Sequence, residues 1–155
     1  MTKFKNKTVL ITGGAAGIGK LMARKILDMG ASKMILWDID KDNLEKAEKE
    51  FKGSGFKIFT YIVDVANLDL VKQIAGKVRS EVGLIDILIN NAGVVIGKYF
   101  HEHSHKEIDF SMHINTSALM HITLEFLHDM MNNGEGHIVN IASAAGMVSN
   151  PKMSV

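Results

Sequence analysis

The sequence predicts an α/β fold built on a doubly wound parallel sheet, with helices on both of its faces. Three observations predict this fold. Short segments rich in β-branched residues recur along the chain and are apolar at nearly every position, as in strands buried on both faces. Segments with helical periodicity separate them. No linker, repeat or low-complexity tract interrupts the alternation, which predicts one three-layer αβα domain over residues 1–155.

Five strands and four helices are expected. The strands lie at residues 8–12, 33–38, 57–64, 85–90 and 137–143. The helices lie within residues 18–30, 40–55, 66–83 and roughly 111–131. The glycines at positions 30 and 53 are expected to end the first two helices. The periodic positions are Ile18, Leu21, Met22, Lys25, Ile26 and Met29 in the first helix, Leu44, Ala47 and Phe51 in the second, and Leu68, Val71, Ile74, Ala75 and Val78 in the third.

Composition excludes several classes of function. The net charge of +1 provides no electrostatic footprint for nucleic acid or for an anionic membrane. The absence of cysteine excludes disulfides and thiolate metal sites, and it fits a cytoplasmic protein. No apolar run approaches the roughly 18 residues that a membrane-spanning helix needs. With 46% hydrophobic and 23% charged residues, the chain has the composition of an ordinary globular protein.

The glycine-rich segment TGGAAGIG joins the first strand to the first helix. Gly13 can form the tight turn, while Gly17 and Gly19 lack a Cβ and let a pyrophosphate approach the amides at the helix N-terminus. A turn that only connects two elements is the alternative, but the strand–turn–helix setting favours dinucleotide binding. The candidate contacts are Gly13, Ala16, Gly17, Ile18 and Gly19.

An acidic residue follows the second strand at the distance that this motif requires. The carboxylate of Asp38 can accept hydrogen bonds from both ribose hydroxyls of an adenosine and would repel a 2′-phosphate. A basic residue that would favour the phosphate is missing, because Ala16 precedes Gly17 and Ile39 follows Asp38. We therefore expect NAD to be preferred over NADP. The alternative for Asp38 is a helix N-cap, a role that Asp40 fills equally well.

Four motifs in order resemble the short-chain dehydrogenase/reductase (SDR) family along the whole chain. They are TGGAAGIG (12–19), DV (64–65), NNAG (90–93) and IVNIASAAG (138–146). The resemblance, which is nearest to the branch acting on retinoids and steroids, implies a Rossmann fold and NAD(P)-dependent hydride transfer between nicotinamide and an alcohol or carbonyl substrate.

The resemblance also implies roles for residues at the cofactor. Asp64 is expected to hydrogen-bond the adenine amino group, and Val65 to pack beside the adenine ring. Asn90 is expected to stabilise the central strand. Asn91, Ala92 and Gly93 are further candidate cofactor contacts, the last two on the adenine–ribose side.

Two catalytic candidates follow from the same resemblance. Asn115 matches the asparagine that kinks the long helix and holds a water of the proton relay, and Ser143 matches the serine that hydrogen-bonds the substrate oxygen. A helix-bending asparagine and a serine that caps the next turn are the alternatives. The family's catalytic Tyr-x-x-x-Lys pair would begin at position 156, whereas the sequence stops at Val155. Tyr61, inside a strand, and Tyr99, in a loop without a lysine one turn later, are poor substitutes.

We therefore expect a parent enzyme of which this chain is the dinucleotide-binding part, incomplete at its C-terminus and inactive alone. A non-catalytic dinucleotide-binding module is the alternative. The last strand would then be an exposed edge, and Met112, Leu119 and Met130 would be unburied on the long helix. The family resemblance implies a homodimer or homotetramer formed through that helix.

Metal and substrate are less constrained by the sequence. His101, His103 and His105 alternate in FHEHSHKE, but no carboxylate or cysteine constellation joins them, so a solvated loop near the substrate mouth is expected and no metal site. The resemblance to the retinoid and steroid branch implies a small lipophilic alcohol or carbonyl substrate.

Overall fold

A five-stranded parallel sheet forms the centre of the computed structural model, which describes residues 3–148 and 151–152. The strands are β1 (Thr8–Thr12), β2 (Lys33–Asp38), β3 (Ile58–Ile62), β4 (Ile87–Asn90) and β5 (His137–Asn140). Their order is β3-β2-β1-β4-β5, and all four pairings are parallel. The carboxyl ends of all strands therefore lie at one edge. The predicted doubly wound α/β sheet is confirmed.

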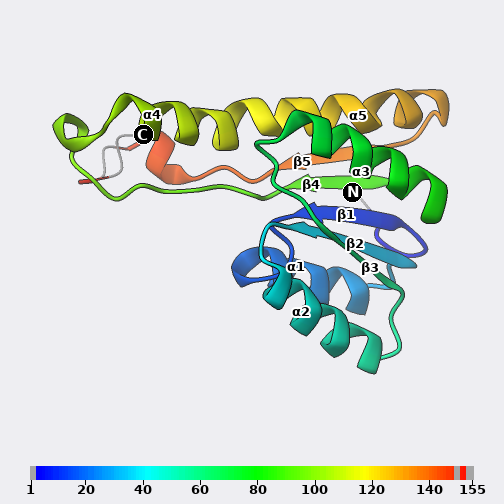
Figure 1. Cartoon of the computed structure of the whole chain (residues 1–155). Helices are drawn as coiled ribbons and strands as arrows, with labels where there is room; N and C mark the ends of the chain where they lie inside the picture. Colours follow the sequence, from blue (N-terminus) through cyan, green and yellow to red (C-terminus); the bar gives the residue numbers. More distant parts are fainter. Residues whose placement is uncertain (1–2, 149–150, 153–155) are drawn as a thin grey trace.

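Helices cover both faces of this sheet (Figure 1). The longer ones are α1 (Gly17–Asp28), α2 (Lys41–Gly53), α3 (Leu68–Glu81), α4 (His105–Met112) and α5 (Ala118–Asn132). Short turns of helix are η1 (Phe100–Glu102), η2 (His113–Ser117) and η3 (Ala144–Gly146). The pair α1 and α2 lies on one face, and α3 and α5 lie on the other. No helix of the described part of the chain is long and apolar enough to cross a membrane.

Each face of the sheet buries its own apolar cluster. Under α1 and α2, Phe51 is fully buried in a cluster that includes side chains of β1, β2 and β3. Under α3 and α5, the rings of Trp37 and Phe126 lie 5.8 Å apart at a tilt of 56°. All five residues of β1 are buried, which is why its sequence TVLIT shows no polar alternation.

The face that α1 turns to the sheet differs in part from the expected one. Ile18, Leu21 and Met29 are 66%, 64% and 57% exposed. Of the other expected positions, Ile26 is buried and Met22 packs partly buried against the core, while Gly19, Ala23 and Leu27 complete the buried face. Small residues let the start of the helix approach the sheet closely, so they determine which side faces inward more than the larger apolar side chains do. The end of α1 agrees better with the sequence prediction, since Gly30 follows the helix with φ +92°.

The long helix begins earlier than expected and is interrupted. It starts with α4, where Ser104 and Glu107 form a capping box, and continues through the π-helical turn η2 into α5. Met112 is 53% exposed, as expected, and Leu119 is half-buried. Met130 was expected to be unburied, which is wrong: it is 5% exposed and packs in the α3–α5 cluster.

Strand ends also differ from the sequence prediction. The third, fourth and fifth strands were expected over residues 57–64, 85–90 and 137–143, and each is shorter in the structure. Beyond β3 and β5 the chain makes one more backbone bond to the neighbouring strand, from the Val63 N–H to the Asp38 carbonyl and from the Ile141 N–H to the Asn90 carbonyl. It then forms turns at the carboxyl edge. The last strand lies at the edge of the described sheet, as expected, and its four residues are exposed or half-buried.

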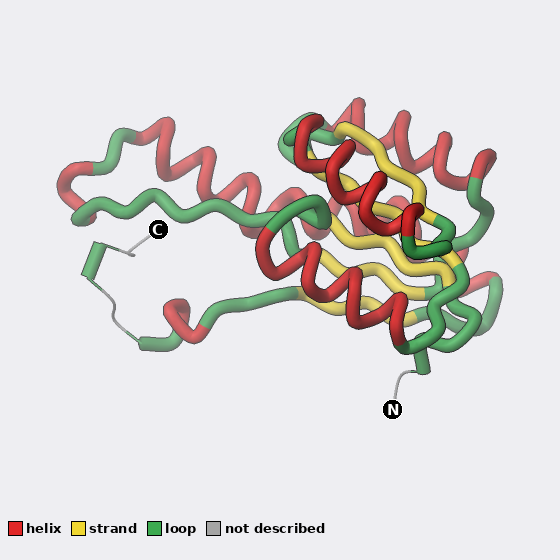
Figure 2. The backbone as a smooth tube through the Cα atoms, turned by 90° about the horizontal axis from the view of Figure 1, so that it is seen from below, coloured by secondary structure: helices red, strands yellow, loops and turns green. Residues whose placement is uncertain are grey.

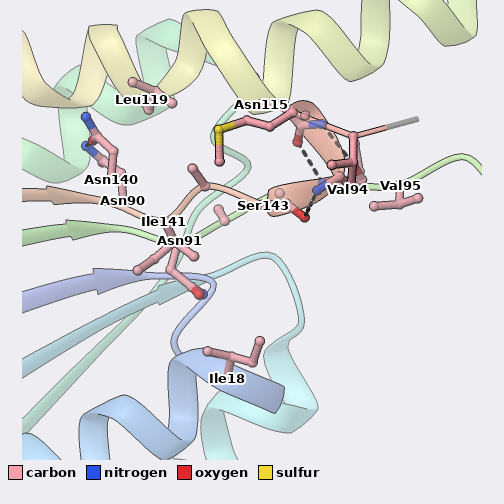
Figure 3. A pocket seen from close by; sticks show the side chains of 17 residues that line it. Ile18, Asn90, Asn91, Val94, Val95, Asn115, Leu119, Asn140, Ile141 and Ser143 are labelled. Atoms are coloured by element: carbon pink, nitrogen blue, oxygen red, sulfur yellow. Dashed lines mark hydrogen bonds between the residues drawn. The ribbon is translucent and has the colours of Figure 1, made fainter. Parts of the chain in front are cut away.

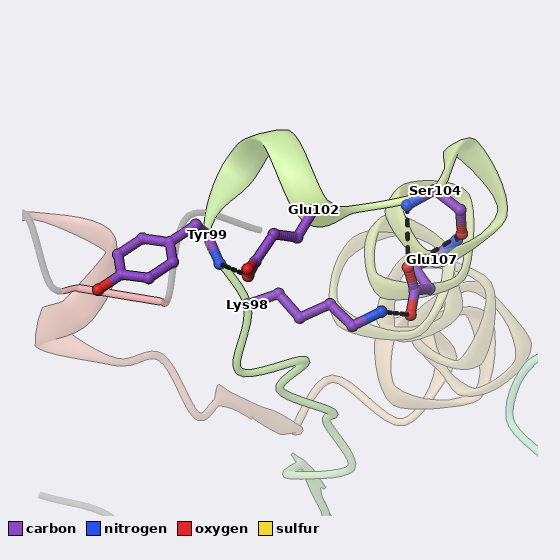
Figure 4. Close-up of polar contacts among 5 residues, drawn as sticks. All are labelled: Lys98, Tyr99, Glu102, Ser104 and Glu107. Carbon is purple, nitrogen blue, oxygen red and sulfur yellow. Dashed lines mark hydrogen bonds and ion pairs between the residues drawn. The ribbon is translucent and has the colours of Figure 1, made fainter.

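Beyond the carboxyl ends of the strands, α4 and the loop after β4 project away from the sheet (Figures 1 and 2). Polar contacts hold this projection together (Figure 4). The Lys98 ammonium lies 2.6 Å from the Glu107 carboxylate, which also accepts from the N–H and hydroxyl of Ser104 at 2.9 and 3.0 Å. Glu102 accepts from the backbone N–H of Tyr99 at 2.8 Å.

Arg79 connects α3 to α5 on the other face. Its Nε donates to the Asp129 carboxylate at 2.6 Å, and a terminal nitrogen donates to the Glu125 carbonyl. The guanidinium carbon lies 5.5 Å from the centroid of the Phe126 ring. One planar cation thus binds a carboxylate, a carbonyl and an aromatic ring.

Arg79→Lys is expected to lower the free energy of unfolding by about 1–2 kcal/mol, because lysine cannot reproduce the forked contact and the pair is only partly shielded from water. Urea unfolding followed by circular dichroism measures the change. Lys77→Ala serves as the control, since its pair with Glu81 is exposed and 3.7 Å long. Equal effects of the two substitutions would contradict the role of Arg79.

The Lys98 ammonium and the Ser104 donors lower the pKa of Glu107 from 4.5 to about 2. A lowered carboxyl pKa stabilises the fold above pH 4.5, and this stabilisation is lost as the pH falls from 4.5 toward 2. Lys98→Ala is expected to raise the pKa of Glu107, which an NMR titration of its side-chain carboxyl carbon measures. Lys106→Ala, on the same helix, is the control. An unchanged titration midpoint in Lys98→Ala would refute the assignment.

Candidate functional site

The turn between β1 and α1 leaves a helix N-terminus open to an anion. Gly13 and Gly17 have φ values of +62° and +50°, in the region that glycine favours. A Cβ added to Gly17 would meet nothing within 4 Å, so the space beside this residue is open. Ala16 provides no side-chain cap, and the first turn of α1 contains no acidic residue. The N–H groups there therefore remain available for a phosphate.

Thr12 and Asn91 hold this turn in place. The Thr12 hydroxyl oxygen accepts hydrogen bonds from the backbone N–H groups of Asn91 and Ala92, each at 3.0 Å. The carboxamide nitrogen of Asn91 donates to the carbonyls of Thr12 and Gly13, also at 3.0 Å. A Cβ on Gly19 would overlap the Gly13 carbonyl, so position 19 requires glycine. Asn91 thus positions the turn with the side chain that the sequence suggested as a cofactor contact.

Asp38 lies at the end of β2 beside the glycine turn. Its carboxylate accepts from the Ala15 N–H at 3.0 Å and from the Asp40 N–H at 3.1 Å. Asp40, not Asp38, is the N-cap of α2. The two backbone contacts leave lone pairs of the Asp38 carboxylate free for ribose hydroxyls. Ile39 is 65% exposed at this edge and brings no positive charge.

Asp64 and Val65 form the turn that follows β3. The Asp64 carboxylate accepts from the Ala66 N–H at 2.9 Å, and the Asp64 carbonyl accepts from the Asn67 N–H at 3.0 Å. Val65 is half-buried against the α3–α5 cluster. This turn is therefore closed by its own hydrogen bonds at the carboxyl edge of the sheet.

A cleft of about 1020 Å³ opens at the carboxyl ends of β4 and β5 (Figure 3). Both catalytic candidates, Asn115 and Ser143, line it. Four of the candidate cofactor contacts line it too, namely Ile18, Asn91, Ala92 and Gly93. The remaining candidates, Gly13, Ala16, Gly17, Gly19, Asp38, Ile39, Asp64 and Val65, lie outside the cleft lining.

Asn115 lies in the π-helical turn and binds the loop after β4. Its carboxamide oxygen accepts from the Val94 N–H, and its nitrogen donates to the Val94 carbonyl, both at 2.9 Å. A Cβ on Gly93 would lie 3.2 Å from that oxygen, so glycine leaves room for the pair of bonds. The helix departs from regular geometry where the sequence predicted a kink.

Ser143 follows β5 and caps η3. Its hydroxyl oxygen accepts from the Ala145 N–H at 3.1 Å. The capping alternative is therefore realised, but the hydroxyl hydrogen is free to donate into the cleft that Ser143 lines. Val94, Val95, Leu119 and Ile141 give the cleft a largely apolar wall.

Neither described tyrosine is placed as an acid/base in this cleft. The Tyr61 hydroxyl donates to the Glu81 carboxylate at 2.8 Å, and burial together with this contact raises the pKa of Tyr61. A catalytic phenol needs a lowered pKa. Tyr99 is 47% exposed at the start of η1, with its ring 6.0 Å from that of His101.

The alternating histidines do not form a cluster in the structure. His101 stacks on Tyr99, His103 follows η1 as its C-cap, and His105 begins α4. Across residues 3–148 and 151–152, no three metal-binding side chains come together.

Sequence reasoning gave no role to two residues at this edge. Thr12 accepts the two amide bonds described above, and its position directly before the glycines was the available signal. His113 lies 2.9 Å from the Ala66 carbonyl through its Nε2, a contact between positions 47 residues apart for which no sequence motif existed.

Comparison with known proteins agrees with this geometry. The model of the short chain dehydrogenase family matches residues 7–155. Estradiol 17-beta-dehydrogenase 11 of Pongo abelii is 43% identical over 143 residues, which are 92% of this chain and 47% of that protein. The chain thus spans about half the length of the relatives that it matches.

Solved structures agree as well. An SDR from Burkholderia phymatum in complex with NAD has a TM-score of 0.92 and 31% identity, over 99% of this chain and 54% of that one. A gluconate 5-dehydrogenase from Burkholderia cenocepacia in complex with NADP and tartrate has a TM-score of 0.90 and 26% identity, over 98% and 60%. The chain belongs to the short-chain dehydrogenase/reductase family.

Proposed function

We propose that this chain forms the dinucleotide-binding part of an NAD-dependent oxidoreductase that transfers hydride between nicotinamide and an alcohol or carbonyl substrate. The observation that carries the proposal is the shared edge of the sheet. An open, uncapped helix N-terminus and a cleft lined by Asn115 and Ser143 both lie there. The relatives support the proposal, because they are named as dehydrogenases. They are about twice as long as this chain.

The pyrophosphate would lie on the amides between Gly13 and Gly19, with Ala16, Gly17 and Ile18 beside it. The adenine would contact Asp64 and Val65. Ala92 and Gly93 would line its ribose side, and Asn91 would hold the turn beneath. The open space at Gly17 fits such a ligand.

The preference for NAD over NADP rests on the charge at the end of β2. The carboxylate of Asp38 faces the glycine turn through its bond to Ala15, and no lysine or arginine adjoins it at Ala16 or Ile39. A 2′-phosphate would be repelled there, whereas two ribose hydroxyls would find acceptors.

Chemistry would take place at the other end of the cleft. Nicotinamide supplies the hydride acceptor or donor when it is bound. The Ser143 hydroxyl would donate a hydrogen bond to the substrate oxygen, and the π-helical turn at Asn115 would hold a water of the proton relay. The proton itself would pass through a Tyr-x-x-x-Lys pair outside the described residues, since the Tyr61 hydroxyl donates to Glu81 and Tyr99 does not line the cleft.

The apolar wall of the cleft favours a small lipophilic alcohol or carbonyl compound as substrate. Helix α5 also carries exposed apolar residues on one side, and Met120, Leu124 and Met131 are 55%, 56% and 65% exposed. A homodimer or homotetramer that covers this side is part of the proposal. A cytoplasmic location stays a prediction.

A dinucleotide-binding module without hydride transfer is the second candidate. It is favoured by one observation: neither tyrosine of the described part is available as the acid/base, because Tyr61 has a raised pKa and Tyr99 lies in the exposed loop. Such a module would bind NAD through the same turn, and only turnover distinguishes the two candidates.

Asp38→Ala is expected to weaken NAD binding by about 1–3 kcal/mol, the cost of leaving ribose hydroxyls unpaired, and to weaken NADP binding less. Isothermal titration calorimetry measures both. Asp42→Ala, in the first turn of α2, is the control and should bind NAD like the unchanged chain. Identical NAD affinity with and without the Asp38 carboxylate would overturn the cofactor assignment.

Ser143→Ala is expected to lower kcat about 10²–10⁴-fold with little change in the dissociation constant of NAD, because the hydroxyl contacts substrate and not cofactor. The measurement is steady-state oxidation of secondary alcohols by the protein extended through the expected Tyr-x-x-x-Lys pair. Ser143→Thr retains the hydroxyl and is the matched control. An extended protein that binds NAD but oxidises no alcohol and reduces no carbonyl would favour the binding module.

A further inference from the structure

Among the hydrogen bonds of the described residues, the contact at the Ala66 carbonyl is the one that joins the long helix to the turn after β3. The rest of this turn is closed locally, through the Asp64 carboxylate on the Ala66 N–H and the Asn67 side chain on the Leu70 N–H at 3.0 Å. The Ala66 carbonyl instead lies 2.9 Å from Nε2 of His113. Both residues are half-buried, so the contact is partly shielded from water.

The chemistry of the two groups determines the state of the histidine. A carbonyl oxygen can only accept a hydrogen bond, so Nε2 of His113 must carry the hydrogen. Both the neutral Nε2–H tautomer and the imidazolium satisfy this condition. The contact therefore exists without protonation of the ring.

The π-helical turn connects this contact to the cleft. His113 is its first residue, and Asn115, two positions later, binds the backbone of Val94 with both atoms of its carboxamide. Residues two apart on a helix do not share a face. The π-helical segment thus contacts the turn after β3 through His113 and the loop after β4 through Asn115.

We propose that His113 is a positioning residue for the adenine end of the cofactor site. It fixes the Asp64–Ala66 turn relative to the helix that carries Asn115. This proposal rests on the proposed function, because it takes the turn after β3 as the adenine contact. Loss of the Nε2–H donor frees the Ala66 carbonyl and lets the turn move away from the sheet edge.

Nucleotide fragments separate the adenine end from the rest of the site. His113→Ala is expected to raise the dissociation constants of NAD and AMP about three- to tenfold, the equivalent of one hydrogen bond, with that of nicotinamide mononucleotide unchanged. His113→Gln places an amide donor where Nε2 lies and should restore AMP binding to within about twofold. His128→Ala, an exposed histidine of α5, is the matched control.

The tautomer offers a test that needs no variant. Nitrogen NMR shifts of His113 are expected to show hydrogen on Nε2 in the unchanged chain. Hydrogen on Nδ1 alone would overturn the proposal, as would AMP affinity that is equal in the unchanged chain and in a folded His113→Ala variant. If His113→Ala does not fold, the AMP dissociation constants of His113→Gln and His113→Met are compared instead, and equal values would overturn the proposal. Failure of the unchanged chain to bind either AMP or NAD would instead contradict the proposed function.

Discussion

The hydroxyl of Thr12 is the point on which the nucleotide site depends. It accepts two amide hydrogens from the start of the loop after β4, while the Asn91 carboxamide donates back to the carbonyls of Thr12 and Gly13. These bonds join β1 to β4. From β1 the sheet grows through β2 and β3 on one side and through β4 and β5 on the other, so the strand order switches between β1 and β4. Ligands of open α/β sheets bind in the crevice at that position. The glycine turn therefore cannot shift without the loop that lines the cleft.

Glycines at this edge make room both for these hydrogen bonds and for a ligand. Gly19 lets α1 begin directly above the Gly13 carbonyl, and Gly93 lets the Asn115 carboxamide reach the Val94 backbone. A Cβ would overlap the Gly13 carbonyl at position 19 and would crowd the Asn115 carboxamide oxygen at position 93, and both of these groups already have partners. The same absence of side chains leaves the amides of the turn accessible from outside. The glycines therefore provide both the space for a ligand and the close packing of the backbone.

Much of the fold follows from the sequence, because parallel strands buried on both faces leave an unbroken apolar signal. The bounds of β1 and β2 agree residue by residue with the prediction. The inward face of α1 was only partly right: Ile26 is buried as predicted, but periodicity favours Ile18 and Leu21 by size, whereas contact with the sheet selects Gly19 and Ala23. The site residues were predicted from sequence motifs, and motifs do not show which groups each side chain contacts. They therefore contain no sign that Asn91 binds backbone carbonyls, or that His113 reaches Ala66.

The π-helical turn of residues 113–117 also restricts how the chain can change in length. A π-helical turn holds one residue more than an α-helical turn would. Deleting one residue here would therefore give a regular helix in which α4 and α5 keep their faces, so Ile122 and Phe126 would stay in the core. The wide turn that places Asn115 against both backbone groups of Val94 would be lost. The length of this stretch thus follows from the loop after β4 and not from the core beneath α5.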